Sequence, residues 1–104
     1  MGTSLRSHNV VVNGHRTSMR LEPEMWSALR EVAGREQMSI NQLCTLINRV
    51  RDRSSLTSAV RVFILAYFRS VAKQLEAPHF SGARQPLDTA LGLTRQQVSS
   101  SPRL

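Results

Sequence analysis

The stretch GHRTSMRLEPEMWSAL, residues 14–29, joins a segment of period two to a segment that a proline opens as a helix. In HRTSMRL, residues 15–21, polar and apolar side chains alternate, as they do in a strand with one face on a core and the other face exposed. The core face of this predicted strand holds Thr17, Met19 and Leu21, and its outer face holds Arg16, Ser18 and Arg20. A lone strand leaves its backbone donors and acceptors unpaired, so a partner strand must come from residues 10–12, from a second copy of the chain, or from both.

A turn signal precedes the predicted strand. The dipeptide Asn13-Gly14 separates VVV, residues 10–12, from the alternating segment. Asn-Gly between two strand-like runs is the strongest short-range signal for a two-residue type I′ hairpin. In that register Val12 faces His15, and the valines at the even positions lie on the core face of the following strand.

Three helices are expected after the strand. Pro23 suits the first turn of a helix over about 23–36, where neighbouring glutamates favour the positive end of the helix dipole. Ser39 is the expected N-cap of a second helix over about 40–51, and apolar residues at spacings of three and four predict a third over about 56–76. Because AVRVFI inside the third segment is rich in β-branched side chains, a strand remains the alternative there.

The predicted core combines the apolar stripes of these helices with the inner face of the hairpin. In the first helix the stripe consists of Met25, Leu29, Val32 and Ala33, with Trp26 on its border. The expected fold class is therefore mainly α with a short β-ribbon.

The predicted organisation is one small folded body with loose ends. Residues 1–9 are polar and are expected to be flexible, residues 10–76 form the folded domain, and residues 77–104 form a flexible tail with at most one weak helix near 87–97. A chain of 104 residues buries a limited share of its surface on its own, so we expect it to dimerise.

The charge balance favours an anionic partner. The chain has 14 basic and 7 acidic residues, a formal net charge of +7, and all basic residues except Lys73 are arginines. Arginine forms bidentate hydrogen bonds to phosphate and to guanine edges, which suits nucleic acid, and acidic lipid is the other candidate for such a charge. A genome-wide arginine bias would explain the ratio of arginine to lysine but not the net charge.

Neither a membrane nor a catalytic role is expected. The longest apolar run, VFILAYF at 62–68, is far too short to span a bilayer, and the broad apolar circumference of the third helix argues against attachment to a membrane surface. The single Cys44 excludes an internal disulfide and a multi-cysteine zinc site, and it fits the reducing cytoplasm. The histidines are scattered through polar segments and no carboxylate pair shares an apolar setting, so we expect no enzyme, catalytic residue, metal or cofactor.

A longer pattern runs from the hairpin into the third helix, because GHRTSMRLEPEMWSAL is followed by SINQL and then by SLTSAVRVFIL. It resembles a subfamily of short proteins in the ribbon-helix-helix superfamily of bacterial repressors, of the Arc/MetJ type, with the signature G-x-RTS-x-x-LE-x-x-FW-x-x-L and then NLSSA-x-R-x-F-x-L. Met25 replaces the phenylalanine of that signature, and Ser55-Leu56-Thr57 replaces Asn-Leu-Ser. The resemblance covers about residues 10–68.

The resemblance implies a mechanism. In this superfamily two chains pair their strands antiparallel, and the two-stranded ribbon enters the major groove of DNA with alternate side chains on base edges. On this sequence the base-reading side chains are those of Arg16, Ser18 and Arg20. The matching phosphate-binding groups, at the start of the second helix, are the backbone N–H groups of Ser39, Ile40 and Asn41. The resemblance therefore implies a homodimeric, sequence-specific transcriptional regulator of the bacterial cytoplasm that binds double-stranded DNA.

Two alternatives stay open. An antitoxin-like or adaptor protein would bind a partner protein through the helix over 56–76 and the tail, with DNA binding secondary or lost. Arg16 and Arg20 would then be ordinary charged residues on an edge strand, where they discourage aggregation. The third helix is absent from the minimal fold, and we expect it to pack on the dimer or to build a larger assembly.

Overall fold

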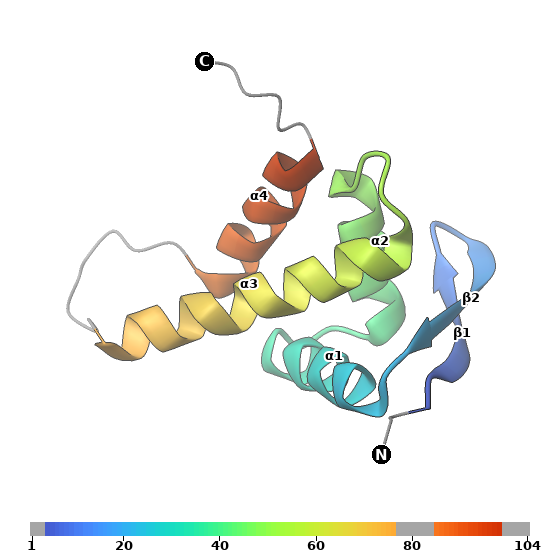
Figure 1. Ribbon diagram of the computed structural model, residues 1–104, viewed down its shortest axis with the longest axis horizontal. Helices are drawn as coiled ribbons and strands as arrows, with labels where there is room; N and C mark the ends of the chain where they lie inside the picture. The colour runs from blue at the N-terminus through green and yellow to red at the C-terminus, as the bar shows by residue number, and fades with distance from the viewer. Residues whose placement is uncertain (1–3, 77–84, 99–104) are drawn as a thin grey trace.

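The computed structural model describes residues 4–76 and 85–98 and consists of a β-hairpin followed by four helices (Figure 1). The elements are β1 Arg6–Val12, β2 His15–Leu21, α1 Pro23–Arg35, α2 Ile40–Val50, α3 Leu56–Glu76 and α4 Pro86–Val98. The predicted class, mainly α with a short β-ribbon, is confirmed, and the three predicted helices lie where the sequence indicates. Among the helices described, none is long and apolar enough to cross a membrane.

The hairpin has the predicted turn and register. Asn13 and Gly14 adopt φ angles of 56° and 83°, the left-handed pair that a type I′ turn requires. β1 and β2 pair antiparallel with Val12 opposite His15. One face of the hairpin is therefore apolar, and its buried side chains, which lie against the helices, are Val10, Val12, Met19 and Leu21.

β1 begins earlier than the sequence suggests. Residues 6–9 lie in the stretch for which flexibility is predicted, yet they extend β1 and pair with the second half of β2. The Trp26 indole N–H donates to the Arg6 carbonyl at 2.9 Å, and the His8 ring packs edge-on against the indole with centroids 4.7 Å apart. The sequence of this segment does not indicate a strand, because polar side chains predominate in it and its contacts are with residues distant in the sequence. Residues 1–3 lie outside the described residues.

Trp26 is a core residue of α1 rather than a border residue. Its side chain is 3% exposed, whereas Met25, which the sequence assigns to the core, is half-buried. The stripe that is buried consists of Trp26, Leu29, Val32 and Ala33. The buried face of α1 therefore differs from the predicted one at a single position, where Trp26 replaces Met25 because its indole lies against the start of β1.

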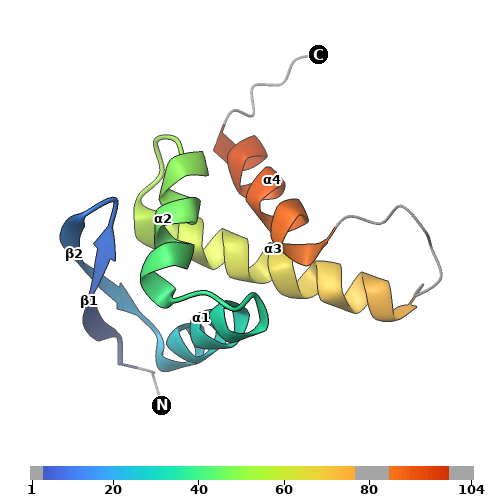
Figure 2. The ribbon, with the colours of Figure 1, turned by 180° about the vertical axis from the view of Figure 1, so that it is seen from behind.

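α3 is helical along its whole length and forms the centre of the molecule, so the strand alternative for this segment is wrong. Its buried side chains form a broad face: Ala59, Val60, Phe63, Ile64, Ala66 and Tyr67. α1, α2, α4 and β2 all contact this helix, and α3 runs between α1 and α4 in both views (Figures 1 and 2). Much of its broad apolar circumference therefore packs within the chain.

α4 occupies residues for which a flexible tail with at most one weak helix is predicted. It packs on α3 and α2, and Ala90 and Thr94 are fully buried. Thr94 Oγ1 donates to the Ala90 carbonyl at 2.7 Å, which satisfies the buried hydroxyl within the helix. The rest of the predicted tail, residues 77–84 and 99–104, lies outside the described residues.

A polar contact ties the end of α1 to α3. The Tyr67 hydroxyl donates to Glu36 Oε2 at 2.6 Å and accepts from Arg35 Nε at 3.3 Å. Burial, together with the Glu36 carboxylate, raises the pKa of Tyr67, so the hydroxyl remains a donor at neutral pH. At the other end of α1, Arg61 of α3 pairs with Glu22 at 3.0 Å. The two contacts join the two ends of α1 to α3.

Replacing Gly14 by alanine should destabilise the protein, whereas the same replacement at Gly34 should stabilise it. Gly14 has a φ of +83°, and an added Cβ would meet nothing within 4 Å. The cost is then the left-handed backbone alone, about 1 kcal/mol. Gly34 lies in α1 with equally open space, and a helix favours alanine over glycine by up to about 1 kcal/mol. Urea unfolding measures both changes, and a Gly14→Ala chain as stable as the wild type would contradict the type I′ turn.

Cys44 should resist thiol reagents while the chain is folded. The side chain is fully buried in α2, and burial raises the pKa of Cys44 to about 11. At about pH 8 roughly one thiol in a thousand is then ionised, before access is considered. Labelling with an aromatic disulfide reagent, followed by absorbance, should proceed at the rate of unfolding and immediately in concentrated urea. Fast labelling of the native chain would mean that the core around α2 opens.

Candidate nucleic-acid interface

The outer face of the hairpin is polar and basic. Six side chains, all exposed, lie on this face in the observed register: Ser7, Asn9, Val11, Arg16, Ser18 and Arg20. The face carries two positive charges and no carboxylate. Such a surface attracts phosphates and offers hydrogen-bonding groups to base edges.

The three predicted base-reading residues lie together on β2. Arg16, Ser18 and Arg20 occupy alternate positions of the strand and share its exposed face. Neither arginine forms an ion pair within the described part of the chain, where the one pair found joins Arg61 and Glu22. The Ser18 hydroxyl lies 2.9 Å from the Ser7 hydroxyl and forms a hydrogen bond across the strands. Both guanidinium groups of β2 are therefore available to a ligand.

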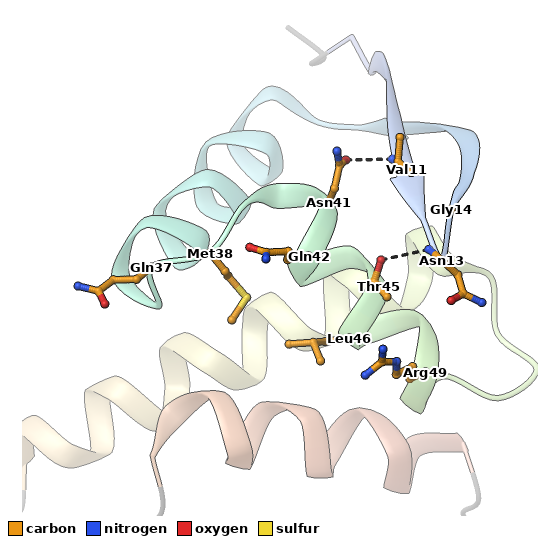
Figure 3. A pocket seen from close by; sticks show the side chains of 10 residues that line it. All are labelled: Val11, Asn13, Gly14, Gln37, Met38, Asn41, Gln42, Thr45, Leu46 and Arg49. Carbon is orange, nitrogen blue, oxygen red and sulfur yellow. Dashed lines mark hydrogen bonds between the residues drawn. The ribbon is translucent and has the colours of Figure 1, made fainter.

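The outer edge of β1 is covered by α2. The Val11 N–H donates to Asn41 Oδ1 at 2.9 Å, and the Asn13 N–H donates to Thr45 Oγ1 at 3.2 Å (Figure 3). Asn41 and Thr45 are four residues apart, which is about 6 Å along a helix axis. Alternate residues of an extended chain are about 6.7 Å apart, so the two acceptors on α2 match the spacing of the two N–H donors on the hairpin. Sequence reasoning missed this role of Asn41 and Thr45, because each partner is 30 or more positions away and no local pattern marks it.

The outer edge of β2 has no strand partner among the described residues, since the sheet has two strands. Residues that flank a two-residue turn form a hydrogen-bonded pair, which here consists of Val12 and His15. The next pair, Val11 and Arg16, directs its backbone N–H and C=O groups away from the partner strand, toward the two outer edges of the hairpin. Val11 directs its N–H toward α2, so Arg16, its opposite on β2, directs its own backbone groups to the other edge. By the same alternation Ser18 and Arg20 do so too. The exposed side chains and the open backbone groups thus belong to the same three residues.

The start of α2 leaves two of the three predicted phosphate-binding groups open. Ser39 Oγ accepts from the Gln42 N–H at 3.0 Å, and Gln42 Oε1 accepts from the Ser39 N–H at 2.8 Å, which forms a capping box. The Ser39 N–H is therefore occupied. The N–H groups of Ile40 and Asn41 lie in the first turn, where no helical carbonyl reaches them, and they have no acceptor in the described residues. The spacing Ser-x-x-Gln in SINQ is the sequence signal for the whole box and not for the cap alone.

A groove of about 730 Å³ runs beside α2 and the hairpin turn. Its lining includes side chains along one face of α2, labelled in Figure 3: Asn41, Gln42, Thr45, Leu46 and Arg49. Arg49 is exposed there, whereas Arg51 donates to Asn48 Oδ1 and to the Ser54 carbonyl. Arg51 therefore holds the turn between α2 and α3, and Arg49 is the cation that the end of α2 presents beside the hairpin.

Comparison with known proteins agrees with this geometry. The family model described as "Ribbon-helix-helix domain" matches residues 5–68, which extend from β1 into α3. Among solved structures, an uncharacterized protein from Bordetella pertussis Tohama I is similar, with 28% sequence identity, a TM-score of 0.59, and coverage of 96% of this chain and 86% of that chain. No curated protein matches the sequence.

The family match includes the hairpin, both helices that follow it and the cap at Ser39. It confirms the resemblance that residues 14–29 carry, and the matched domain is of the DNA-binding, regulatory type. Because the matched residues make up more than half of the chain, the protein belongs to the ribbon-helix-helix family.

Proposed function

We propose that the protein is a sequence-specific, DNA-binding transcriptional regulator of the bacterial cytoplasm. It acts as a homodimer, with the β2 strands of two copies paired and inserted into the major groove. One observation carries the proposal: the strand with the exposed basic side chains is also the strand with the open edge. The DNA-binding type of the matched family supports the same conclusion.

The dimer that fits the open edge pairs β2 with β2 antiparallel about Ser18. Because α2 occupies the outer edge of β1 at Val11 and at the turn, whereas the outer edge of β2 has no partner in the described residues, the proposal adds the further strand at β2. Ser18 is the central residue of His15–Leu21, and a twofold axis beside it pairs every residue of the two strands. Arg16 then lies opposite Arg20 of the partner subunit, and like charges in this position disfavour pairing until an anion compensates them. DNA therefore stabilises the dimer that reads it.

Four strands are too wide for the major groove, so the two pairs of strands have different tasks. Adjacent strands lie about 4.8 Å apart, and four of them span about 14 Å between the outer strand axes, against a groove about 12 Å wide. The central β2 strands enter the groove, and the β1 strands remain above the sugar-phosphate backbones. Ser7 and Asn9, on the outer face of β1, are then close to phosphates, which suits their hydrogen-bonding side chains.

The spacing of residues along β2 suits base pairs. Alternate strand residues are about 6.7 Å apart, which is close to two steps of about 3.4 Å in DNA. Arginine donates to both major-groove acceptors of guanine, O6 and N7, while serine both donates and accepts and so discriminates less. Arg16 and Arg20 are therefore the main specificity residues, with Ser18 as a weaker reader between them. The twofold axis requires a site that is an inverted repeat.

The backbone N–H groups of Ile40 and Asn41 are the phosphate anchors of this proposal. They lie at the positive end of the α2 dipole, where anions bind readily. The Asn41 side chain also accepts from the Val11 N–H, so the anchor and the ribbon are directly joined. Ser39 acts indirectly, since its capping box holds the first turn in shape.

A second candidate function is binding of a partner protein through α3 and the C-terminal region, as in an antitoxin or an adaptor. The observation that favours it is a groove between α3 and α4 whose lining includes the exposed Leu65 and Leu93. DNA reading and partner binding use different surfaces, so the two functions are compatible.

Arg20→Ala should weaken binding to the preferred DNA by about 1 to 3 kcal/mol and relax the preference at one base position in each half-site. The reason is the loss of a bidentate contact to guanine. Selection of genomic fragments by the purified protein at physiological salt, followed by sequencing, measures both effects. Arg69→Ala, which removes the same charge from the exposed surface of α3, is the matched control and should leave the selected site unchanged.

Non-specific phosphate binding is expected of a chain with a net charge of +7, so affinity alone does not test base reading. An inverted repeat that the wild type enriches and Arg16→Ala/Arg20→Ala does not enrich would support it. Equal enrichment of one site by both proteins would exclude β2 as the reader.

Ser18→Cys should be cross-linked to its counterpart on the second chain by a short bismaleimide reagent. Opposed residues of a hydrogen-bonded antiparallel pair have Cα atoms about 5.5 Å apart. Cys44 is buried and unreactive, so the natural chain serves as the background, and Ser27→Cys, at an exposed position of α1, should give no covalent dimer. The β2 pairing is contradicted if Ser18→Cys gives no dimer on a denaturing gel at concentrations where sedimentation detects dimers.

A further inference from the structure

A second groove, of about 400 Å³, lies between α3 and α4. Its lining includes Val62, Leu65, Arg69 and Lys73 of α3 and Leu93 of α4. In both ribbon views α2 lies between α4 and the hairpin, so this groove is separated from the basic face of the ribbon (Figures 1 and 2). Part of its lining also lies beyond residue 68, where the family match ends.

Two leucines in the wall of the groove are left exposed by the described residues. Leu65 is 59% exposed and Leu93 is 44% exposed. α4 buries Ala90 and Thr94 on the face that packs into the molecule, so the position of Leu93 at the groove is set by the core contacts of its own helix. The outward face of both helices therefore presents leucines that the described residues leave partly exposed.

The lining residues of α3 form one continuous stripe. Val62, Leu65, Arg69 and Lys73 are spaced by three or four positions, which places them on one side of the helix. The stripe is about 16 Å long, at a rise of about 1.5 Å per residue. A groove of this length between two helices, apolar at one end and basic at the other, matches the docking of an amphipathic helix of about three turns.

The charge at one end of the groove specifies the partner further. Arg69 and Lys73 are exposed, and within the described residues neither lies in an ion pair with Glu76 or Asp88 of the same two helices. A second copy of this chain, with a formal charge of +7, would bring cations to these cations. A partner with carboxylates beside its apolar side chains is complementary to both features.

We propose that the groove between α3 and α4 binds an acidic amphipathic helix of a partner protein. Apolar side chains of that helix pack between Leu65 and Leu93, and its carboxylates pair with Arg69 and Lys73. This inference rests on the second candidate function, binding of a partner protein, and states the chemical character of that partner. It does not depend on DNA reading by β2. The proposed dimer would carry one such groove on each subunit, away from the DNA, where it can hold a second protein at the site that the ribbon selects.

The test uses a fluorescein-labelled helical peptide of about three turns, with leucines at positions i, i+3 and i+7 and glutamates on both sides of them. Its charge-reversed version has lysine in place of every glutamate. Fluorescence anisotropy with the full chain should give saturable binding of the acidic peptide and none of the basic one. The affinity should fall as salt rises, because exposed ion pairs are screened.

Variants identify the surface. Leu65→Ala and Arg69→Glu should each weaken binding of the acidic peptide on the order of tenfold, through lost apolar contact and reversed charge respectively. Leu75→Ala removes a leucine of α3 that is 78% exposed and lies outside the groove, and it should have no effect. Arg20→Ala, which lowers the charge at the ribbon, should also leave peptide affinity unchanged. Protection of Cys44 from thiol reagents checks that each variant is folded.

Three results would overturn the proposal. One is the absence of saturable binding at peptide concentrations up to about 1 mM. Another is equal binding by the wild type, Leu65→Ala and Arg69→Glu. The third is recruitment to vesicles of phosphatidylglycerol and phosphatidylcholine, lost in Arg69→Glu, without binding of the peptide, which would assign the groove to a lipid surface. Each of these leaves the fragment selection by Arg20 unaffected, so failure here is distinct from failure of the DNA-reading proposal.

Discussion

The hydrogen bonds from the backbone of Val11 in β1 and of Asn13 in the turn to Asn41 and Thr45 determine how the hairpin is joined to the helices. They hold α2 along the outer edge of β1, with the start of the helix beside Val11. The inner face of the hairpin then meets the helical core, and its basic outer face is turned to solvent. If α2 lay elsewhere, both edges of the hairpin would be open, and the position of the anion-binding helix start relative to the ribbon would be undefined.

Stability and geometry come from different interactions in this arrangement. Each backbone-to-side-chain hydrogen bond contributes about 1 kcal/mol net, whereas burial of a side chain such as Met19 or Leu21 contributes about 2 kcal/mol. The apolar face therefore supplies most of the free energy that holds the hairpin on the helices. Burial has little directional preference, however, so the hydrogen bonds at Asn41 and Thr45 select the edge that is covered. The open edge of β2 is a result of that selection.

Local patterns predict most of the fold. A few neighbouring residues are enough to predict three features of the fold. They are the turn at Asn13-Gly14, the strand over residues 15–21 and the helix α3. The part of β1 over residues 6–9 is not predictable in this way, because its pairing depends on β2 and its contact with Trp26. The sequence understates α4 because its buried Thr94 counts as polar in a sequence pattern, although its hydroxyl is satisfied within the helix.

The candidate site is predictable to a similar degree. The alternation alone puts Arg16, Ser18 and Arg20 on one face, and their role in base reading stays a prediction. The phosphate-binding set is reduced from three N–H groups to two, because the capping box uses the Ser39 N–H. The coverage of β1 by Asn41 and Thr45 joins positions 30 and 32 apart in the sequence, and a single sequence holds no signal for such a pairing.

The hairpin also has a consequence for how the amount of the proposed dimer depends on the total concentration of the protein. Because β2 pairs with β1 of the same chain, the cluster of buried side chains forms within one molecule. Assembly of the proposed dimer is then a separate, second-order step, and while monomers predominate the amount of dimer rises with the square of the total concentration. In the proposed scheme a newly made chain therefore folds before it is competent to bind DNA. In this scheme, occupancy of the target site then rises more steeply with the rate of synthesis than it would for a protein that binds DNA as a monomer.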